Sequence, residues 1–185
     1  MNRVLLTALP SLLVLGALAA CGAGDPTVST TGITTSAAAR TTTTTAQPAG
    51  PPPAPQPVSD GQCPYLASSV VQEANGQLVR KVRLSADQPD PACFFYANAT
   101  EVQLSVWVFR GEPATAKAVV DRAAPVADSN PASVPAGWKG GSLTTDDGAV
   151  YAVAKDGIAV VVTSNQKQTV KARTVTEAVV ENLGL

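Results

Sequence analysis

An apolar run that ends in a cysteine constrains this chain more than any other feature. The run begins at Val4, follows the charged side chain of Arg3, and closes with Leu18-Ala19-Ala20-Cys21. One positive charge, an apolar stretch and small residues before a cysteine are typical of a bacterial lipoprotein signal. We therefore expect residues 1–20 to be removed as a signal peptide and Cys21 to be the lipid attachment site.

A membrane-spanning helix is the alternative interpretation of this run, because it has about the minimum length for a span. Pro10 and Gly16 interrupt it, however, and no basic cluster follows it. We therefore favour the lipid anchor. The expected mature protein is held at the extracytoplasmic face of the cell membrane by acyl chains such as palmitate, and does not span the membrane.

The segment after Cys21 is rich first in threonine and then in proline, before the composition becomes that of a globular domain. Residues 22–61 contain the threonine run 41–45 and then many prolines. Such a segment buries too little apolar surface to offset the entropy of ordering it. We expect residues 21–61 to form a lipidated, disordered Thr/Pro-rich tether and residues 62–185 to form one globular domain.

Charge and composition limit the possible partners. The chain has 185 residues, of which 15% are charged, and its net charge is −1. A nucleic-acid partner would require a basic patch that neutralises phosphates, so we expect none. Near-neutral charge also argues against electrostatic attachment to a membrane surface, which leaves the lipid as the expected contact with the membrane.

Two cysteines remain after Cys21 is assigned to the lipid, namely Cys63 and Cys93. Exported proteins fold in an oxidising environment, so we expect these two to form a disulfide. The alternative is two free thiols or half of a metal site. The chain has no histidine, which makes a structural zinc site a poor fit, and we expect neither a metal nor a cofactor.

Hydrophobic periodicity predicts an α+β domain. Helical spacing of apolar residues marks three segments, 63–75, 112–124 and 168–183, while alternation or β-rich composition marks six, 78–84, 92–97, 101–110, 142–144, 149–154 and 158–164. The connections between the strands are short, which favours antiparallel pairing. We expect a mostly antiparallel sheet of about five or six strands, packed with two or three helices and stapled by one disulfide.

Catalytic groups are scarce in this sequence. A serine or cysteine nucleophile needs a base, and no histidine is present to serve as one. Two carboxylate pairs remain as candidates for acid–base work, Asp87 with Asp90 and Asp146 with Asp147. Both pairs lie beside Pro or Gly, where aspartate is a common turn former. We therefore expect no enzyme activity, and a hydrolase based on carboxylates remains the competing hypothesis.

Three aromatic side chains are the candidate ligand-binding residues. Trp138 follows a long loop with several prolines, and an exposed tryptophan there would be a good binding anchor. The alternative, which we favour, is that Trp138 folds back over the sheet edge. Trp107 and Phe109 lie on one predicted strand, where they either fill the core or line a ligand cleft.

Five short motifs carry a family resemblance: Cys63-Pro64-Tyr65-Leu66, Pro91-Ala92-Cys93-Phe94-Phe95-Tyr96, Ala124-Pro125-Val126, Gly137-Trp138-Lys139-Gly140-Gly141 and Val150-Tyr151-Ala152-Val153. With these motifs, residues 62–185 resemble secreted actinobacterial lipoproteins that carry domain of unknown function 2020. The resemblance implies a compact α/β domain outside the cell with no assigned catalysis. It also implies, for some members, interaction with a host.

The sequence as a whole predicts a non-enzymatic binding domain on a cell-envelope lipoprotein. The expected partner is a protein, a wall polymer or a host factor near the anchored surface. The alternative is a carrier or sensor of a small apolar, lipid-like molecule, held in a cleft between the sheet and the helices.

Overall fold

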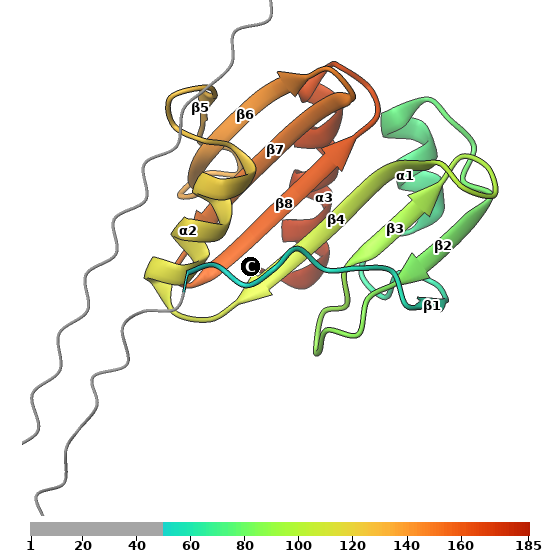
Figure 1. Ribbon diagram of the computed structural model, residues 1–185, viewed down its shortest axis with the longest axis horizontal. Helices are drawn as coiled ribbons and strands as arrows, with labels where there is room; N and C mark the ends of the chain where they lie inside the picture. Colours follow the sequence, from blue (N-terminus) through green and yellow to red (C-terminus); the bar gives the residue numbers. More distant parts are fainter. Residues whose placement is uncertain (1–49) are drawn as a thin grey trace, which may run out of the picture. The chain divides into compact units, whose positions relative to one another are not determined.

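The computed structural model describes residues 50–185 (Figure 1). The expected signal peptide 1–20, the lipid attachment site Cys21 and most of the expected tether lie outside the described residues. Within the described part, one open antiparallel sheet has the strand order β1-β2-β3-β4-β8-β7-β6-β5. The α+β class and the antiparallel sheet are therefore confirmed.

Along the chain the strands form two groups, β1 to β4 and β5 to β8, and a helix follows each group. The eight strands are β1 (Ser59–Asp60), β2 (Lys81–Leu84), β3 (Cys93–Tyr96), β4 (Val102–Arg110), β5 (Asn130–Ala132), β6 (Lys139–Thr145), β7 (Gly148–Lys155) and β8 (Ile158–Ser164). The three helices are α1 (Ser68–Asn75), α2 (Pro113–Ala123) and α3 (Thr169–Leu183).

The strand number differs from the expected five or six because both sheet edges are short strands. β1 has two residues and β5 has three, which is too short for a visible alternation of apolar side chains. They are strands only through their backbone pairing with β2 and β6. Pro131 lies within β5, and proline is tolerated there because an edge strand leaves one side of its backbone unpaired.

The first helix is shorter than the sequence predicted. It begins at Ser68 and not at Cys63, since Cys63 is held by a disulfide and the side chains of Tyr65 and Leu66 turn into the core. Its end was predicted correctly, because Gly76 has a φ of 74° and closes α1 in the left-handed conformation.

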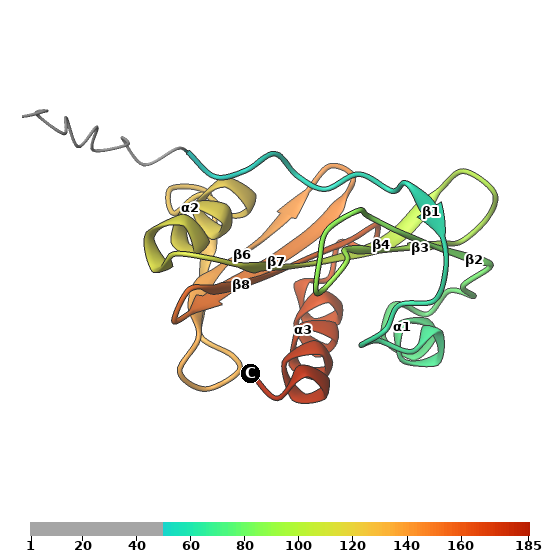
Figure 2. The same cartoon turned by 90° about the horizontal axis from the view of Figure 1, so that it is seen from below.

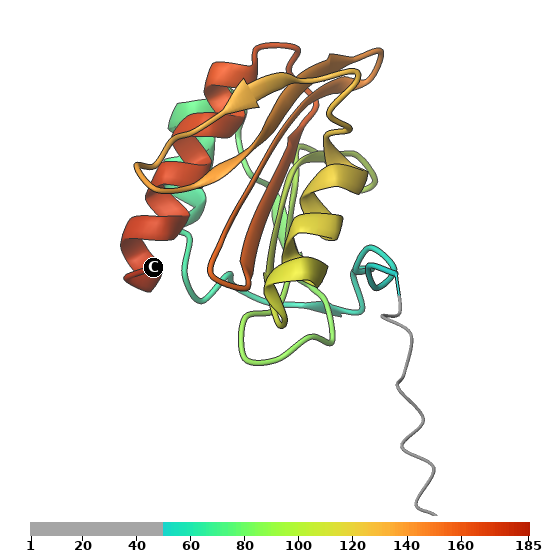
Figure 3. The ribbon, with the colours of Figure 1, turned by 90° about the vertical axis from the view of Figure 1, so that its left-hand side faces the viewer.

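Helices cover both faces of the sheet (Figures 2 and 3). α2 lies on one face, while α1 and α3 lie side by side on the other. Strand β4 shows how the faces differ: Val106 and Val108 belong to the core beneath α1 and α3, whereas Trp107 and Phe109 pack against the core beneath α2. The clear alternation predicted for this strand therefore serves two separate cores.

A bulge in β4 attaches α1 to the sheet. Phe95 pairs with Leu104 and Tyr96 with Val102, which leaves Gln103 as an extra residue. The buried Gln103 amide accepts a hydrogen bond from Asn75 Nδ2 (3.1 Å) and donates one to the Leu78 carbonyl (2.8 Å). The end of α1 is thus fixed by buried hydrogen bonds to β4.

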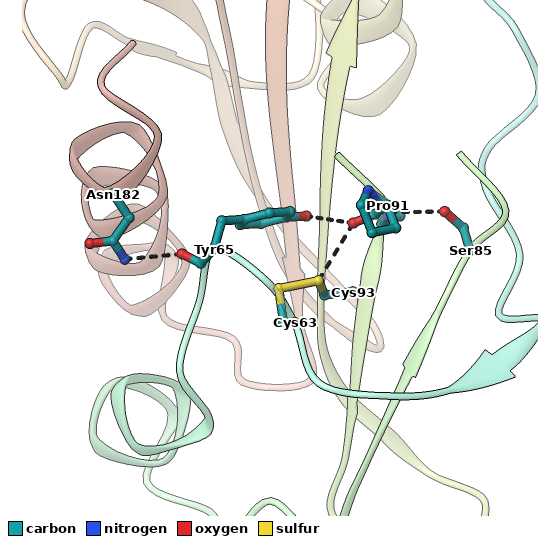
Figure 4. Close-up of a disulfide and its surroundings, with 7 residues drawn as sticks. Cys63, Tyr65, Ser85, Pro91, Cys93 and Asn182 are labelled. Carbon is teal, nitrogen blue, oxygen red and sulfur yellow. Dashed lines mark hydrogen bonds between the residues drawn. A yellow bond between two sulfur atoms is a disulfide. The ribbon is translucent and has the colours of Figure 1, made fainter. Parts of the chain in front are cut away.

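The predicted disulfide is confirmed and lies where three segments meet (Figure 4). Cys63 and Cys93 are bonded, with their Cα atoms 5.6 Å apart. Nearby, the Tyr65 hydroxyl donates to the Pro91 carbonyl (2.9 Å), and the Asn182 side chain donates to the Tyr65 carbonyl (3.0 Å). The disulfide and these bonds hold the segment before α1 between β3 and the end of α3.

Removing the disulfide should destabilise the domain without changing its fold. The crosslink joins residues separated by 30 positions, for which the loop-entropy model gives about 3.5 kcal/mol. We expect the free energy of unfolding of Cys63→Ala/Cys93→Ala, measured in urea, to fall by an amount of this order. Reductant should destabilise the wild type similarly and leave the double variant unchanged; equal stability of the two proteins would contradict this role.

The buried Tyr65 hydroxyl should make stability sensitive to alkaline pH. Burial raises the pKa of Tyr65 above its ordinary value of 10.0, and the negative charges of Asp90 and Asp87 raise it further. Because the folded-state pKa is the higher one, the stabilisation is complete below about pH 10 and is lost as the pH rises further. Urea unfolding between pH 8 and 11 should therefore show a steep fall in the wild type.

Tyr65→Phe should reduce that fall, because phenylalanine has no proton to lose. At pH 7 the same variant should lose about 1 kcal/mol with the hydrogen bond to the Pro91 carbonyl. Any remaining dependence in the variant would include Tyr151, whose pKa burial also raises. Identical pH dependence in the wild type and Tyr65→Phe would show that Tyr65 ionisation does not govern alkaline stability.

Candidate functional site

A cleft of about 470 Å³ lies between α2, the loop that follows it, β6 and the turn joining β7 to β8. Its apolar lining includes Val120 and Ala124 from α2 and its end, together with Ala154 from β7. Val126, in the loop, also lines the cleft and is 78% exposed. We call this hollow the α2 cleft; it presents apolar surface to solvent between a helix and the sheet.

Close packing of the loop on β6 gives one side of the cleft its shape. A Cβ atom on Gly141 would lie 2.4 Å from Ser129 Oγ and 3.0 Å from Ala124 Cβ. A glycine at this position therefore allows the loop after α2 to approach the strand. Ser129 also donates a hydrogen bond to the Ala124 carbonyl (3.3 Å), which ties the loop to the end of the helix.

Charged side chains surround the apolar lining. Lys117, Lys139 and Lys155 all line the cleft and are exposed. Lys117 pairs with Asp121 one turn along α2, whereas Lys139 and Lys155 form no ion pair within residues 50–185. The strand side of the cleft therefore offers two cationic groups to a bound molecule, with the exposed carboxylate of Asp156 beside them.

The three aromatic candidates do not form one site. Trp138 is 2% exposed and belongs to the core beneath α1 and α3, so it cannot serve as an exposed anchor and instead fills the core. Trp107 and Phe109 lie on the α2 face. Their rings form an edge-to-face pair with centroids 6.2 Å apart. The structure brings this pair together and separates it from Trp138.

Trp107 and Phe109 line a second hollow on the α2 face. It measures about 240 Å³ and is also lined by Pro52, Pro53 and the loop 87–90. The Arg122 guanidinium lies 5.6 Å from the centroid of the Trp107 ring, close enough for a cation–π interaction. We call the surface formed by Trp107, Phe109, the neighbouring Arg122 and the loop 87–90 the proline groove; Pro52 and Pro53 lie against it, and the hollow is the space that they leave open.

The carboxylates considered for catalysis have local partners or face solvent. Asp87 accepts a hydrogen bond from Ser85 Oγ (2.6 Å), and Asp90 forms an ion pair with Arg110 (2.6 Å). Asp146 and Asp147 are exposed in the turn between β6 and β7. None of these four residues lines the α2 cleft.

The part of the chain that the structure describes is residues 50–185. This part of the chain contains no group of three or more histidine, cysteine, aspartate or glutamate side chains arranged to hold a metal ion. None of its helices is both long enough and apolar enough to cross a membrane.

Sequence reasoning missed the α2 cleft, because its residues are lysines and small apolar side chains with no chemical signature. The Gly140-Gly141 pair and the Lys155-Asp156-Gly157 turn were the available signals. In the sequence, the glycine pair indicates an unusual backbone and the turn indicates a hairpin, and residues of both line the cleft or support it. Neither pattern by itself indicates a hollow.

The chain matches a known protein family over most of its length. The family described as domain of unknown function, DUF2020, matches residues 45–185, and no curated protein matches the chain. The matched range contains every described element, both bonded cysteines, the α2 cleft and the proline groove. The chain therefore belongs to the DUF2020 family.

Proposed function

We propose that this chain is a lipid-anchored envelope protein whose domain binds a small amphiphilic molecule without transforming it. The observation that carries the proposal is the α2 cleft. Its volume of about 470 Å³ falls within the range of ligand pockets in proteins, which are mostly apolar with a few placed polar groups. The cleft thus favours the carrier or sensor function among the binding functions expected from the sequence.

The lining of the cleft indicates the ligand class. Val120, Ala124 and Ala154 would contact an apolar chain, while Lys139 and Lys155 would meet an anionic end group. Charge-assisted hydrogen bonds from ammonium groups to a carboxylate or phosphate are stronger than neutral ones. We therefore assign the cleft to an acidic amphiphile such as a medium-chain fatty acid.

Binding without catalysis is supported by the titratable groups around the cleft. Asp121 is paired with Lys117, and Asp156 is exposed in the turn between β7 and β8. The chain has no histidine to act as a general base at neutral pH. These groups can orient a charged ligand, and we assign no reaction to them.

The cleft proposal predicts specific binding of dodecanoate, a simple probe with an apolar chain and a carboxylate. We expect saturable binding by calorimetry below the micellar concentration, and weaker binding of the uncharged dodecanol. Ala154→Leu should abolish it by filling the cleft, with Ala99→Leu as an exposed control. Lys139→Gln/Lys155→Gln should weaken dodecanoate binding and leave dodecanol unaffected, with Lys167→Gln as control.

Two results would contradict the assignment of the cleft. If none of these amphiphiles bound saturably, the proposed class of ligand would be wrong. Equal binding by the wild type and Ala154→Leu would place the bound molecule elsewhere on the protein.

The lipid anchor is a separate part of the proposal and rests on residues 1–21. We expect the wild type in its native host to remain with the membrane fraction and to incorporate labelled palmitate. Cys21→Ala should lose the label, while Cys63→Ala/Cys93→Ala should keep it, because only Cys21 follows the small residues of the signal. Membrane retention of Cys21→Ala at wild-type levels would contradict a lipid anchor at this position.

A further inference from the structure

The segment before β1 lies across the α2 face of the sheet (Figure 2). It begins at Gly50, runs through five prolines to Pro57, and continues into β1, which pairs with β2. We expected this part of the chain to belong to the disordered tether, yet it packs on the domain. Pro51, Pro52, Pro55 and Pro57 are half-buried, while Pro53 and Ala54 are exposed.

Arg122 holds the start of this segment. Its Nη1 atom donates hydrogen bonds to the carbonyl oxygens of Pro51 (3.2 Å) and Pro52. The same guanidinium lies over the Trp107 ring. One arginine on α2 therefore links the proline segment to the aromatic pair on β4.

We propose that the proline groove is a recognition site for proline-rich segments of a partner protein, and that Pro51–Pro57 is its exchangeable resident occupant. Polyproline II chains have no internal hydrogen bonds, so their carbonyls are free to accept from a donor such as Arg122. Aromatic-lined grooves bind such segments because the extended chain is already ordered before binding. The groove presents both features, an aromatic pair and a cation at its edge.

The distribution of contacts makes exchange possible. The groups that recognise the segment, Arg122, Trp107 and Phe109, belong to α2 and β4, and none belongs to the segment itself. A separate attachment follows the prolines, where Val58 N donates to the Leu84 carbonyl (2.8 Å) and Gly61 N donates to the Val82 carbonyl (3.1 Å). The prolines can therefore leave the groove while β1 stays paired.

The groove is independent of the α2 cleft. The two hollows share no lining residue, and the occupant of the groove is a peptide, not an amphiphile. A partner with a proline-rich segment would compete with Pro51–Pro57 for the same aromatic pair and the same arginine.

The proposal can be tested with variants of the full chain in which Pro51–Pro57 contacts the proline groove less well. Pro52→Ser/Pro53→Ser/Pro55→Ser removes proline rings without touching the core, and Ala54→Ser is a matched control in the same segment. Of the two tryptophans, Trp138 is buried, so acrylamide quenching of fluorescence reports mainly on Trp107. We expect stronger quenching in the triple variant and wild-type quenching in Ala54→Ser.

The triple variant should also bind a synthetic peptide of residues 50–58, and bind it more tightly than the wild type does, since its groove is no longer occupied. Peptide binding should restore protection of Trp107. Adding Arg122→Gln should weaken peptide binding about tenfold through loss of charge-assisted hydrogen bonds. Arg80→Gln, an exposed arginine outside the groove, is the control and should have no effect.

Three outcomes would overturn the proposal. Unchanged Trp107 quenching in the triple variant would show that the prolines do not cover the groove. Failure of the triple variant to bind the peptide would show that the groove has no affinity in trans. A heterodimer between the triple variant and the wild type, with no binding of the free peptide, would show that the groove binds the segment of a second copy of this chain and not a partner protein.

Discussion

The pairing of β4 with β8 is the constraint on which the rest of this structure depends. The two strands are far apart in sequence and are the final strands of two successive groups. Their antiparallel register runs from Leu104 opposite Ser164 to Arg110 opposite Ile158. Through this pairing the disulfide-bonded group and the group that forms the α2 cleft become one sheet. Val106 opposite Val162 contributes to one core, and Trp107 opposite Val161 faces the other.

The α2 cleft and the proline groove lie on the same face of the sheet, which helices cover less completely than the other face. On the other face, α1 and α3 pack side by side over one large core. On the α2 face, a single helix of 11 residues covers mainly β6, β7 and β8. The α2 cleft opens at one side of this helix, and the rest of the face over β4 is covered by the proline segment. A sheet of eight strands with one helix on this face leaves apolar surface that other groups can contact.

Periodicity predicted the long central elements well and the edges poorly. The alternation in Val102–Arg110 and the turn Lys155-Asp156-Gly157 indicate a strand and a hairpin without tertiary information. Asp156 adopts a positive φ of 48°, as such a turn requires. The two edge strands exist through backbone hydrogen bonds to a neighbour, which leave no pattern in the sequence. Gln103 is similar, because its burial depends on a bulge that only the register between β3 and β4 reveals.

The candidate site was harder to predict because it depends on which face each aromatic residue occupies. Sequence placed Trp107 and Phe109 on the same side of one strand, which is correct. It could not place Trp138 relative to them, because Trp138 immediately precedes β6 and its direction depends on how the preceding loop closes. The α2 cleft is lined by charged, small and apolar residues that form no sequence motif, so only their arrangement in space identifies it.

The buried polar side chains already have their hydrogen-bond partners within the protein. Within the described residues, every buried side-chain nitrogen or oxygen has a hydrogen-bond partner. Asn75, for example, accepts from Ser164 Oγ (2.6 Å) while its amide donates to Gln103. These hydrogen bonds stabilise the fold, and no buried side-chain nitrogen or oxygen of the described residues is left for a ligand to bind. Both proposed binding sites accordingly use groups at the surface of the α2 face, namely exposed lysines and a half-buried aromatic pair.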